Sequence, residues 1–244
     1  MDFAYRDRAK YLGDPDFFKV PQELLTSKKY ANDIFQEIKK GNLPPKVKVD
    51  IFEGEETTHF SILDKWGNAV SNTYTLNTAY GSGIIPTGTG ILMNNQMDDF
   101  SSKPGHPNAY GLIGSEANKI EPKKTPLSSM SPTIVLRDKR PFLITGSPGG
   151  STIITSVLQE ILNVLDFNMS LKASSEKKRI HFQHLPDILF HEQFVESLIK
   201  SIKKEKKTVS RSLGEIHSIL IKKDIVEAYS DKRRPDGKAS AVYE

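Results

Sequence analysis

The 244 residues of the chain suffice to bury a core as one domain. A hydrophobic content of 37% and a mean hydropathy of −0.43 are typical of a soluble globular protein, and no apolar run reaches the roughly 18 residues that a membrane span needs. The net charge of +4 is too modest to indicate a nucleic-acid partner. The absence of cysteine excludes disulfides, thiol catalysis and cysteine-bound zinc.

The N-terminal quarter of the chain is charged and polar. Residues 1–8 include acidic side chains and no apolar stretch, so they do not predict a secretory signal. Arg6–Val20 is expected to be turn-rich, whereas Leu25–Lys40 has a Thr-Ser cap followed by apolar residues at helical spacing and predicts a helix. Gly41–Glu56 contains a Pro-Pro pair and an acidic run, and it predicts an exposed linker where a backbone could be cut.

Two runs of alternating residues follow this linker. Thr57–Leu63 and Ala69–Leu76 predict an antiparallel hairpin whose loop is Asp64–Asn68. With a five-residue loop, Thr57 lies directly opposite Thr75, and the two hydroxyls meet on one face. A loop one residue longer or shorter would make the two threonines diagonal neighbours instead. The pattern alone is also compatible with threonine serving only as a good strand former.

The remaining elements are predicted in the same way. Tyr80–Asn95 is expected to be irregular, with short strand pieces such as Gly90–Met93, and Asn94–Gly114 to be a long loop. The later elements are a hairpin of Ser131–Leu136 and Phe142–Thr145, helices over Ser151–Leu165, Ser170–Ile180 and Glu192–Lys206, and closing strands at His217–Ile221, Ile225–Tyr229 and Ala239–Tyr243. Strand pairs followed by helices predict a helix layer packed on antiparallel sheet, an α+β fold.

Four blocks in this order carry a family resemblance: TTHFS with WGNAVS, then NNQMDDF, PLSSMSP and GSPGG. Together they resemble the catalytic subunit of the γ-glutamyltransferases, also called glutathione hydrolases, over about residues 5–191. The resemblance implies a partial four-layer αββα sandwich of the N-terminal-nucleophile hydrolase type. It further implies that residues 1–56 correspond to the end of the large subunit with its cleavage linker, and residues 57–244 to the small catalytic subunit.

The resemblance also assigns the chemistry of acyl transfer. It implies self-cleavage between Glu56 and Thr57, after which the new α-amine of Thr57 can serve as the base for its own hydroxyl. Thr75 would orient that hydroxyl. Gly149 and Gly150 match the glycines of the family's oxyanion hole, although their spacing alone is equally typical of an ordinary turn between strand and helix.

The expected substrate-binding residues also match family positions. Ser128 and Ser129 would bind an α-carboxylate, and Tyr110 would act as a lid over the site. The residues expected at the amino end are Asn77, Gln96 and Asp99. Without the family, most of these residues would be assigned to turns and solvated loops.

Two departures from the family stand out. The family's main carboxylate partner is an arginine in a part of the large subunit that does not match this chain. The stretch Ser174–Arg179 also differs from the small-residue-Pro-Arg pattern expected before His181, which leaves the packing of that helix open. The histidines show no metal-binding spacing, and His59 is expected to pack or orient rather than to catalyse.

The resemblance implies a γ-glutamyl acyltransferase or hydrolase that acts on glutathione-like amides through a γ-glutamyl-Thr57 ester. Water or an amino acid would accept the acyl group, no metal or organic cofactor is implied, and a separate large-subunit chain is an expected partner. The family is usually periplasmic, secreted or at the cell surface. The competing hypothesis is a non-enzymatic remnant, or a subunit that is inactive without a separate large-subunit chain.

Overall fold

The computed structural model describes residues 1–44, 57–106, 114–193, 207–223 and 225–242. Short 3-10 turns cover Gln96–Asp99, Glu116–Asn118 and Gly150–Thr152. The helices are α1 Asp2–Tyr11, α2 Gln22–Leu25, α3 Lys28–Lys39, α4 Ile153–Leu165 and α5 Leu171–Ser175. The strands are β1 Thr57–Leu63, β2 Ala69–Thr75, β3 Thr133–Arg137, β4 Arg140–Thr145, β5 Ile180–His181, β6 Ile188–His191, β7 Lys207–Ser210, β8 His217–Lys222 and β9 Ile225–Ser230.

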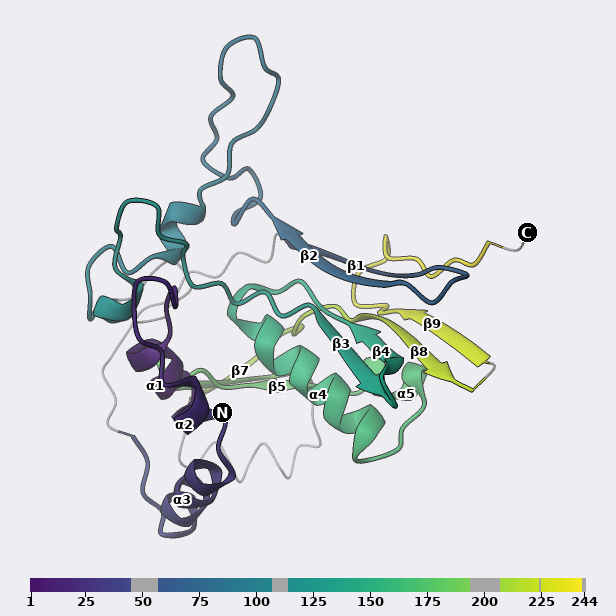
Figure 1. Ribbon diagram of the computed structural model, residues 1–244, viewed down its shortest axis with the longest axis horizontal. Coiled ribbons are helices and arrows are strands. Elements are labelled where there is room, and N and C mark those ends of the chain that lie inside the picture. The colour runs from purple at the N-terminus through teal and green to yellow at the C-terminus, as the bar shows by residue number, and fades with distance from the viewer. Residues whose placement is uncertain (45–56, 107–113, 194–206, 224, 243–244) are drawn as a thin grey trace.

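The centre of the molecule is an antiparallel sheet in the order β3-β4-β8-β9, with α4 and α5 along one face (Figure 1). The core between sheet and helices joins apolar side chains from β4, β8 and both helices, namely Phe142, Leu143, Val164, Leu171 and Leu220. The β1–β2 hairpin covers the opposite face. Within the described residues, the hairpin, the central sheet and the helices form three layers, and β5, β6 and β7 form a further sheet. This combination of helices and sheets agrees with the α+β prediction.

The hairpin has the predicted strands and register. Thr57 pairs with Thr75 and Leu63 with Ala69, as the five-residue loop requires. Small polar side chains line its inner face, and two of them fix it to the sheet: Ser61 Oγ donates to the carbonyl of His217, and Ser71 Oγ donates to the carbonyl of Thr145, both at 2.9 Å. The first residue of β1 is thereby held against the central sheet.

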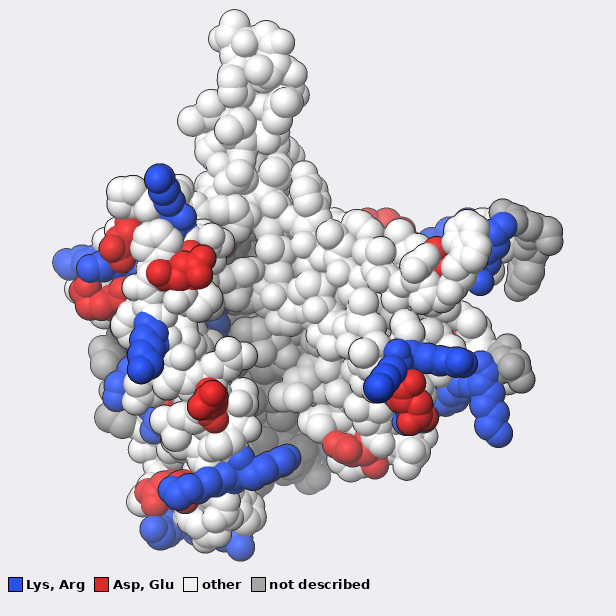
Figure 2. Space-filling view, viewed as in Figure 1, with Lys and Arg blue, Asp and Glu red and all other residues white. Residues whose placement is uncertain are grey.

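The outer face of the hairpin carries large apolar side chains. Phe60, Ile62, Val70 and Tyr74 alternate with the inner polar residues and are 44–64% exposed. The loop that follows β2 projects away from the body of the molecule (Figure 1), and no Lys, Arg, Asp or Glu occurs between residues 76 and 97, so this arm is white in Figure 2. Both features present an uncharged surface.

Two N-terminal expectations have different outcomes. The helix predicted over Leu25–Lys40 is confirmed as α3, and Ser27 caps it by accepting a hydrogen bond from the amide of Tyr30 at 3.1 Å. The expectation that Arg6–Val20 is turn-rich throughout is wrong for its first part, because α1 extends to Tyr11. Tyr5 explains the difference: its hydroxyl donates to the carbonyl of Ser151 at 2.7 Å, a tertiary contact that helical periodicity does not report.

The other elements follow the predictions in part. The β3–β4 hairpin, α4, β8 and β9 are confirmed, whereas the predicted helix Ser170–Ile180 is only α5, Leu171–Ser175. Gly90–Met93 forms no strand, and the described residues 239–242 form none either. Most of the predicted linker Gly41–Glu56 and of the predicted helix Glu192–Lys206 lies outside the described residues.

Candidate active site

Two threonine hydroxyls meet at the start of the hairpin. Thr57 is 8% exposed, and its Oγ1 donates to Thr75 Oγ1 at 3.2 Å. Thr75 Oγ1 also accepts a hydrogen bond from the backbone amide of Asn77 at 2.9 Å. Because both strands are paired along their length, the hydroxyl of Thr57 has a defined position.

This pair lies at the wall of a cavity of about 190 Å³ between the hairpin, α1 and the loops after β2. The cavity is also lined by other residues expected at the site, namely Asn77, Gln96, Asp99, Ser128, Ser129 and Gly150. Gly149 adjoins Gly150 and lines a separate depression, and Tyr110 lies outside the described residues. The fold thus brings together residues from Arg8 to Ile153, which are 145 positions apart in the sequence.

Gly149 and Gly150 form the turn between β4 and α4, with φ values of 130° and 55°. A side chain at Gly149 would come within 2.6 Å of Thr152 Oγ1 and 3.1 Å of the Cα of Gly214, so only glycine fits. The two amides precede Thr152 N, which donates back to Gly149 O at 3.0 Å. Amides at the start of a helix have no partner within that helix and favour an anion.

Asp99 and Gln96 form an acceptor pair on the other side of the cavity. Gln96 Nε2 donates to Asp99 Oδ2 at 2.6 Å, whereas Gln96 Oε1 is buried and has no hydrogen-bond partner within the described part of the chain. Burial raises the pKa of Asp99 to about 6, against the opposing effects of Gln96 and Arg8. A carboxylate next to an unsatisfied amide oxygen matches a ligand that donates several hydrogen bonds and carries positive charge.

Arg8 of α1 is the residue that the sequence analysis missed. Its Nη2 donates to Ser129 Oγ at 3.0 Å, and it lines the same cavity as Thr57. The sequence analysis named only Ser128 and Ser129 for a carboxylate, and the structure places the guanidinium of Arg8 beside Ser129 in the same cavity. The available signal was the block DRAKYLGDPDFFKVP, in which Arg8 is the second residue.

His59 lies on the inner face of the hairpin and is 4% exposed. Its ring nitrogens hydrogen-bond Thr73 Oγ1 at 2.9 Å and Ser61 Oγ at 3.2 Å, and its ring stacks on His217 with 6.5 Å between centroids. Burial and the neighbouring His217 lower the pKa of His59 to about 4, so it is neutral at physiological pH. These contacts are those of a packing residue, and neither ring nitrogen bonds Thr57.

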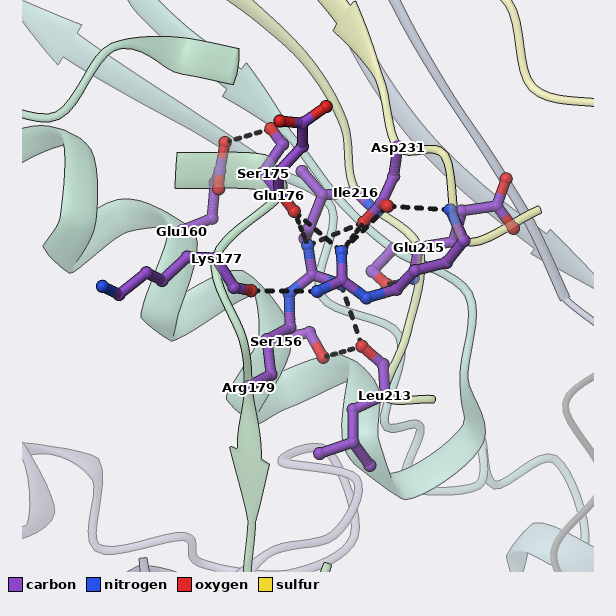
Figure 3. A network of polar contacts seen from close by, with 12 residues as sticks. Ser156, Glu160, Ser175, Glu176, Lys177, Arg179, Leu213, Glu215, Ile216 and Asp231 are labelled. Carbon is purple, nitrogen blue, oxygen red and sulfur yellow. Dashed lines mark hydrogen bonds and ion pairs between the residues drawn. The ribbon is translucent and has the colours of Figure 1, made fainter. Parts of the chain in front are cut away.

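A buried polar network surrounds Arg179 (Figure 3). Arg179, 2% exposed, donates to Asp231 Oδ2 at 2.8 Å and to the carbonyl of Leu213 at 2.9 Å. Glu192 accepts from the amide of Leu213 at 3.0 Å and from Arg233. This network fixes the chain just before Gly214, which touches Gly149.

The stretch Ser174–Arg179, whose packing the sequence left open, is part of the same network. Ser174 and Ser175 donate to the two carboxylate oxygens of Glu160 in α4, at 2.6 and 3.0 Å. Arg179 and Arg233 both donate to the carbonyl of Ser175, at 2.7 and 2.8 Å. Polar contacts therefore join this stretch to α4.

No group of three or more His, Cys, Asp or Glu side chains with metal-binding geometry occurs among the described residues. Within the same residues, no helix is long and apolar enough to cross a membrane. The site is thus built from hydroxyls, one amide–carboxylate pair, an arginine and the glycine turn. These are groups for binding a charged substrate and for acyl transfer.

The fold and the threonine-bearing hairpin place the protein among the α+β hydrolases of the N-terminal-nucleophile type. The sequence model described as γ-glutamyltranspeptidase matches residues 1–241, and the chain belongs to that family.

Individual relatives agree with this assignment. A glutathione hydrolase proenzyme of Escherichia coli K12 is 48% identical over 230 residues, which cover 91% of this chain and 40% of that protein. A solved Helicobacter pylori γ-glutamyltranspeptidase mutant is 47% identical, with a TM-score of 0.69 over 72% of this chain and 100% of that chain. A cephalosporin acylase from Bacillus halodurans, 22% identical, shares the fold over 100% of this chain and 44% of that chain, with a TM-score of 0.80. The chain thus spans about 40% of the length of the E. coli relative.

Proposed function

We propose that this chain carries the catalytic region of a γ-glutamyl acyltransferase or hydrolase that acts on glutathione and related γ-glutamyl amides. The observation that carries the proposal is the Thr57 hydroxyl, held 3.2 Å from that of Thr75 at the wall of a cavity that also contains Asp99 and Gly150. The family membership and the names of the relatives support the substrate class.

The proposed nucleophile is Thr57 after cleavage of the Glu56–Thr57 bond. The Thr57 hydroxyl attacks the carbonyl of Glu56, the amide nitrogen leaves as the amine of Thr57, and water hydrolyses the resulting ester. That amine, with a pKa of about 8, then takes the hydroxyl proton when a substrate amide is attacked. Thr75 accepts a hydrogen bond from the hydroxyl and orients it.

The remaining cavity residues bind the γ-glutamyl group and the developing charge in this proposal. Asn77, Gln96 and Asp99 hold the α-ammonium, and Ser128 and Ser129 hold the α-carboxylate. The amides of Gly149 and Gly150 donate to the oxyanion as the scissile carbonyl becomes tetrahedral. Water or an amino acid then accepts the acyl group from Thr57, and Tyr110 serves as the lid.

The proposed division is residues 1–56 as the end of a large subunit and residues 57–244 as the small subunit. The coverage of a solved chain supports it, because 72% of this chain aligns with all of the H. pylori chain. A large-subunit polypeptide that supplies the rest of the family length is the proposed partner.

Intact mass spectrometry of the purified chain tests the proposal. We expect a product that begins at Thr57, together with release of p-nitroaniline from γ-glutamyl-p-nitroanilide. Thr57→Ala abolishes both, whereas Thr57→Ser retains part of each because a hydroxyl remains. An intact chain that still turns over the anilide contradicts the mechanism, and an intact, inactive chain favours the non-enzymatic remnant. The same assay with an added large-subunit polypeptide tests the proposed partner.

A further inference from the structure

Three hairpin turns lie at the end of the molecule away from the candidate active site. The β3–β4 and β8–β9 turns are neighbours, because β4 and β8 are antiparallel with Leu143 opposite Leu220. The β1–β2 turn points to the same side (Figure 1). Thr57 and Gly150 of the cavity lie at the other ends of β1 and β4. We call residues 64–68, 136–140, 222–223 and 225–226 the turn surface.

The turn surface is rich in cations, and Lys and Arg gather near the β3–β4 and β8–β9 turns in Figure 2. Six exposed Lys and Arg side chains belong to it, namely Lys65, Arg137, Lys139, Arg140, Lys222 and Lys223. The three turns also contain three Asp residues, including Asp224, which lies outside the described residues. Asp64 accepts hydrogen bonds from the amides of Trp66 and Asn68 in its own turn, at 2.9 and 2.8 Å. Six cations against three anions give these turns most of the net charge of +4.

Exposed apolar side chains lie among these cations. Trp66, the only tryptophan of the chain, is 77% exposed, and Lys65 Nζ lies 5.1 Å from the centre of its ring. Leu136 comes just before the β3–β4 turn and is 59% exposed. Ile225 and Val226 follow the β8–β9 turn and are 63% and 56% exposed. Each turn therefore presents an apolar side chain within a few residues of a cation.

We infer that the turn surface binds the surface of an anionic lipid bilayer. Each Lys or Arg near such a surface strengthens binding by roughly fivefold through attraction to anionic headgroups. Tryptophan and aliphatic side chains are favoured at the boundary between headgroups and acyl chains. A nucleic acid would also attract the cations, but it offers no apolar medium to Leu136, Ile225 and Val226. The inference does not rest on the proposed function.

This mode of binding leaves the candidate active site accessible. β1 has seven residues, so Thr57 lies roughly 20 Å from the turn that follows Leu63. The cavity at Thr57 is therefore well separated from the bilayer, and a bound chain should still admit small substrates.

Vesicle binding by the purified chain tests the inference, with Trp66 as a reporter inside the turn surface. Vesicles of phosphatidylcholine are compared with vesicles in which one quarter of the lipid is phosphatidylglycerol. We expect cosedimentation only with the anionic vesicles, after subtraction of any pelleting without lipid. Emission from Trp66 should shift to the blue and be quenched by brominated acyl chains, because the exposed ring leaves water. Salt should weaken the binding, since it screens exposed charges.

Paired variants locate the binding surface. Arg140→Gln/Lys222→Gln removes two cations from it, and we expect the partition coefficient onto anionic vesicles to fall about 10- to 30-fold. Lys28→Gln/Lys39→Gln removes the same charge from α3, on the other side of the molecule (Figure 1), and should stay within about twofold. Circular dichroism melts confirm that both variants fold.

Two further measurements complete the test. Trp66→Ser should weaken vesicle binding about 10-fold, because an apolar side chain is lost from the interface. Equal binding to both kinds of vesicle, an unshifted Trp66 emission, or equal losses in the two double variants overturns the inference. Tighter binding to duplex DNA than to the anionic vesicles also overturns it and assigns the turn surface to a nucleic acid.

Discussion

Thr57 has no basic side chain within hydrogen-bond distance in the described part of the chain. Among the described residues its hydroxyl bonds that of Thr75, and His59, two residues further along the strand, bonds Thr73 and Ser61. With a pKa near 4, His59 would also be a weak proton acceptor. In the proposed mechanism the proton therefore goes to the α-amine of Thr57, which cleavage of the backbone produces.

Removal of the Thr75 hydroxyl tests its proposed orienting role. We expect Thr75→Ala to cleave at Thr57 but to lower kcat for γ-glutamyl-p-nitroanilide about 10-fold or more, because the nucleophile and the amide of Asn77 both lose an acceptor. Mass spectrometry and steady-state kinetics measure the two effects separately. Thr75→Ser is the matched control, and equal kcat in Thr75→Ala and wild type contradicts the role.

Asp99 predicts a pH dependence of substrate selection. Burial raises its pKa to about 6, so the carboxylate is charged above this value and becomes neutral as the pH falls through it. The preference for γ-glutamyl- over glutaryl-p-nitroanilide should therefore decline below about pH 6, since only the former carries an ammonium. The ratio of the two kcat/KM values cancels the titration of the Thr57 amine. A ratio that is flat down to about pH 5, or unchanged in Asp99→Asn, contradicts this assignment.

Among the helices and strands, sequence patterns correctly predicted those whose position depends mainly on neighbouring residues in the chain. The β1–β2 register follows from loop length and alternation, and α4 follows from an apolar face at helical spacing. The pattern failed for α1, whose buried residues Phe3, Tyr5 and Asp7 are spaced by two and whose position depends on distant Ser151. It also failed for short strands such as β5, which exist only because they pair with β6.

The residues of the candidate site also differ in whether a local sequence pattern could predict them. The Thr57–Thr75 pairing could be predicted from the residues alone, whereas the resemblance supplied Gln96, Asp99 and Ser129 as candidates. Neither predicted Arg8, because its placement depends on how α1 packs against the rest of the chain. Local pattern determines a hairpin register, but the convergence of separate loops and helices on one cavity is a tertiary property.

The network around Arg179 predicts a large effect on stability. Arg179→Met removes one hydrogen bond to the carboxylate of Asp231 and one to the carbonyl of Leu213, although Arg233 and Ser156 still donate to these groups. We therefore expect the free energy of unfolding to fall by about 1–3 kcal/mol. Urea denaturation measures this change, with Lys172→Met on exposed α5 surface as the control. A loss below about 1 kcal/mol would mean that this network contributes little to holding the chain near Gly214.

The same network gives stability a pH dependence. Burial would raise the pKa of Asp231, but the charges of Arg179 and Arg233 outweigh burial and lower it. The pKa of Glu192 is lowered in the same manner, mainly by Arg233. These carboxylates stabilise the fold above their unfolded pKa values of about 4, and the stabilisation is lost as the pH falls through their lower folded pKa values. Glu160, whose pKa burial raises, acts oppositely and costs stability as it ionises on rising pH.

At the scale of the whole molecule, the hairpin presents its apolar face outward. Its polar inner face packs on the sheet, while Phe60, Ile62, Val70 and Tyr74 remain 44–64% exposed. The neighbouring arm adds Ile84, Ile85 and Ile91 at 58–62% exposure (Figure 2). Several large apolar side chains exposed on the hairpin and on the arm that follows it favour association.

We therefore expect the purified chain to self-associate. Sedimentation velocity should show a mass above the monomer that decreases on dilution. Phe60→Ser/Tyr74→Ser should shift the distribution toward monomer, because both side chains leave the outer face and neither contributes to the inner contacts. Asn72→Ser, a polar change on that face, is the control. A wild-type chain that is monomeric with a sharp cooperative melt contradicts this expectation.

The pairing of β1 with β2 also sets the molecularity of the proposed cleavage. The attacking hydroxyl of Thr57 and the carbonyl of Glu56 that it attacks are neighbours in one chain, and seven register pairs hold the strand that begins at Thr57. Self-cleavage is then a first-order process, whose half-time does not change when the protein is diluted, in contrast to the self-association described above. The strand also remains paired after the cut, so the new terminus stays where the cleavage formed it.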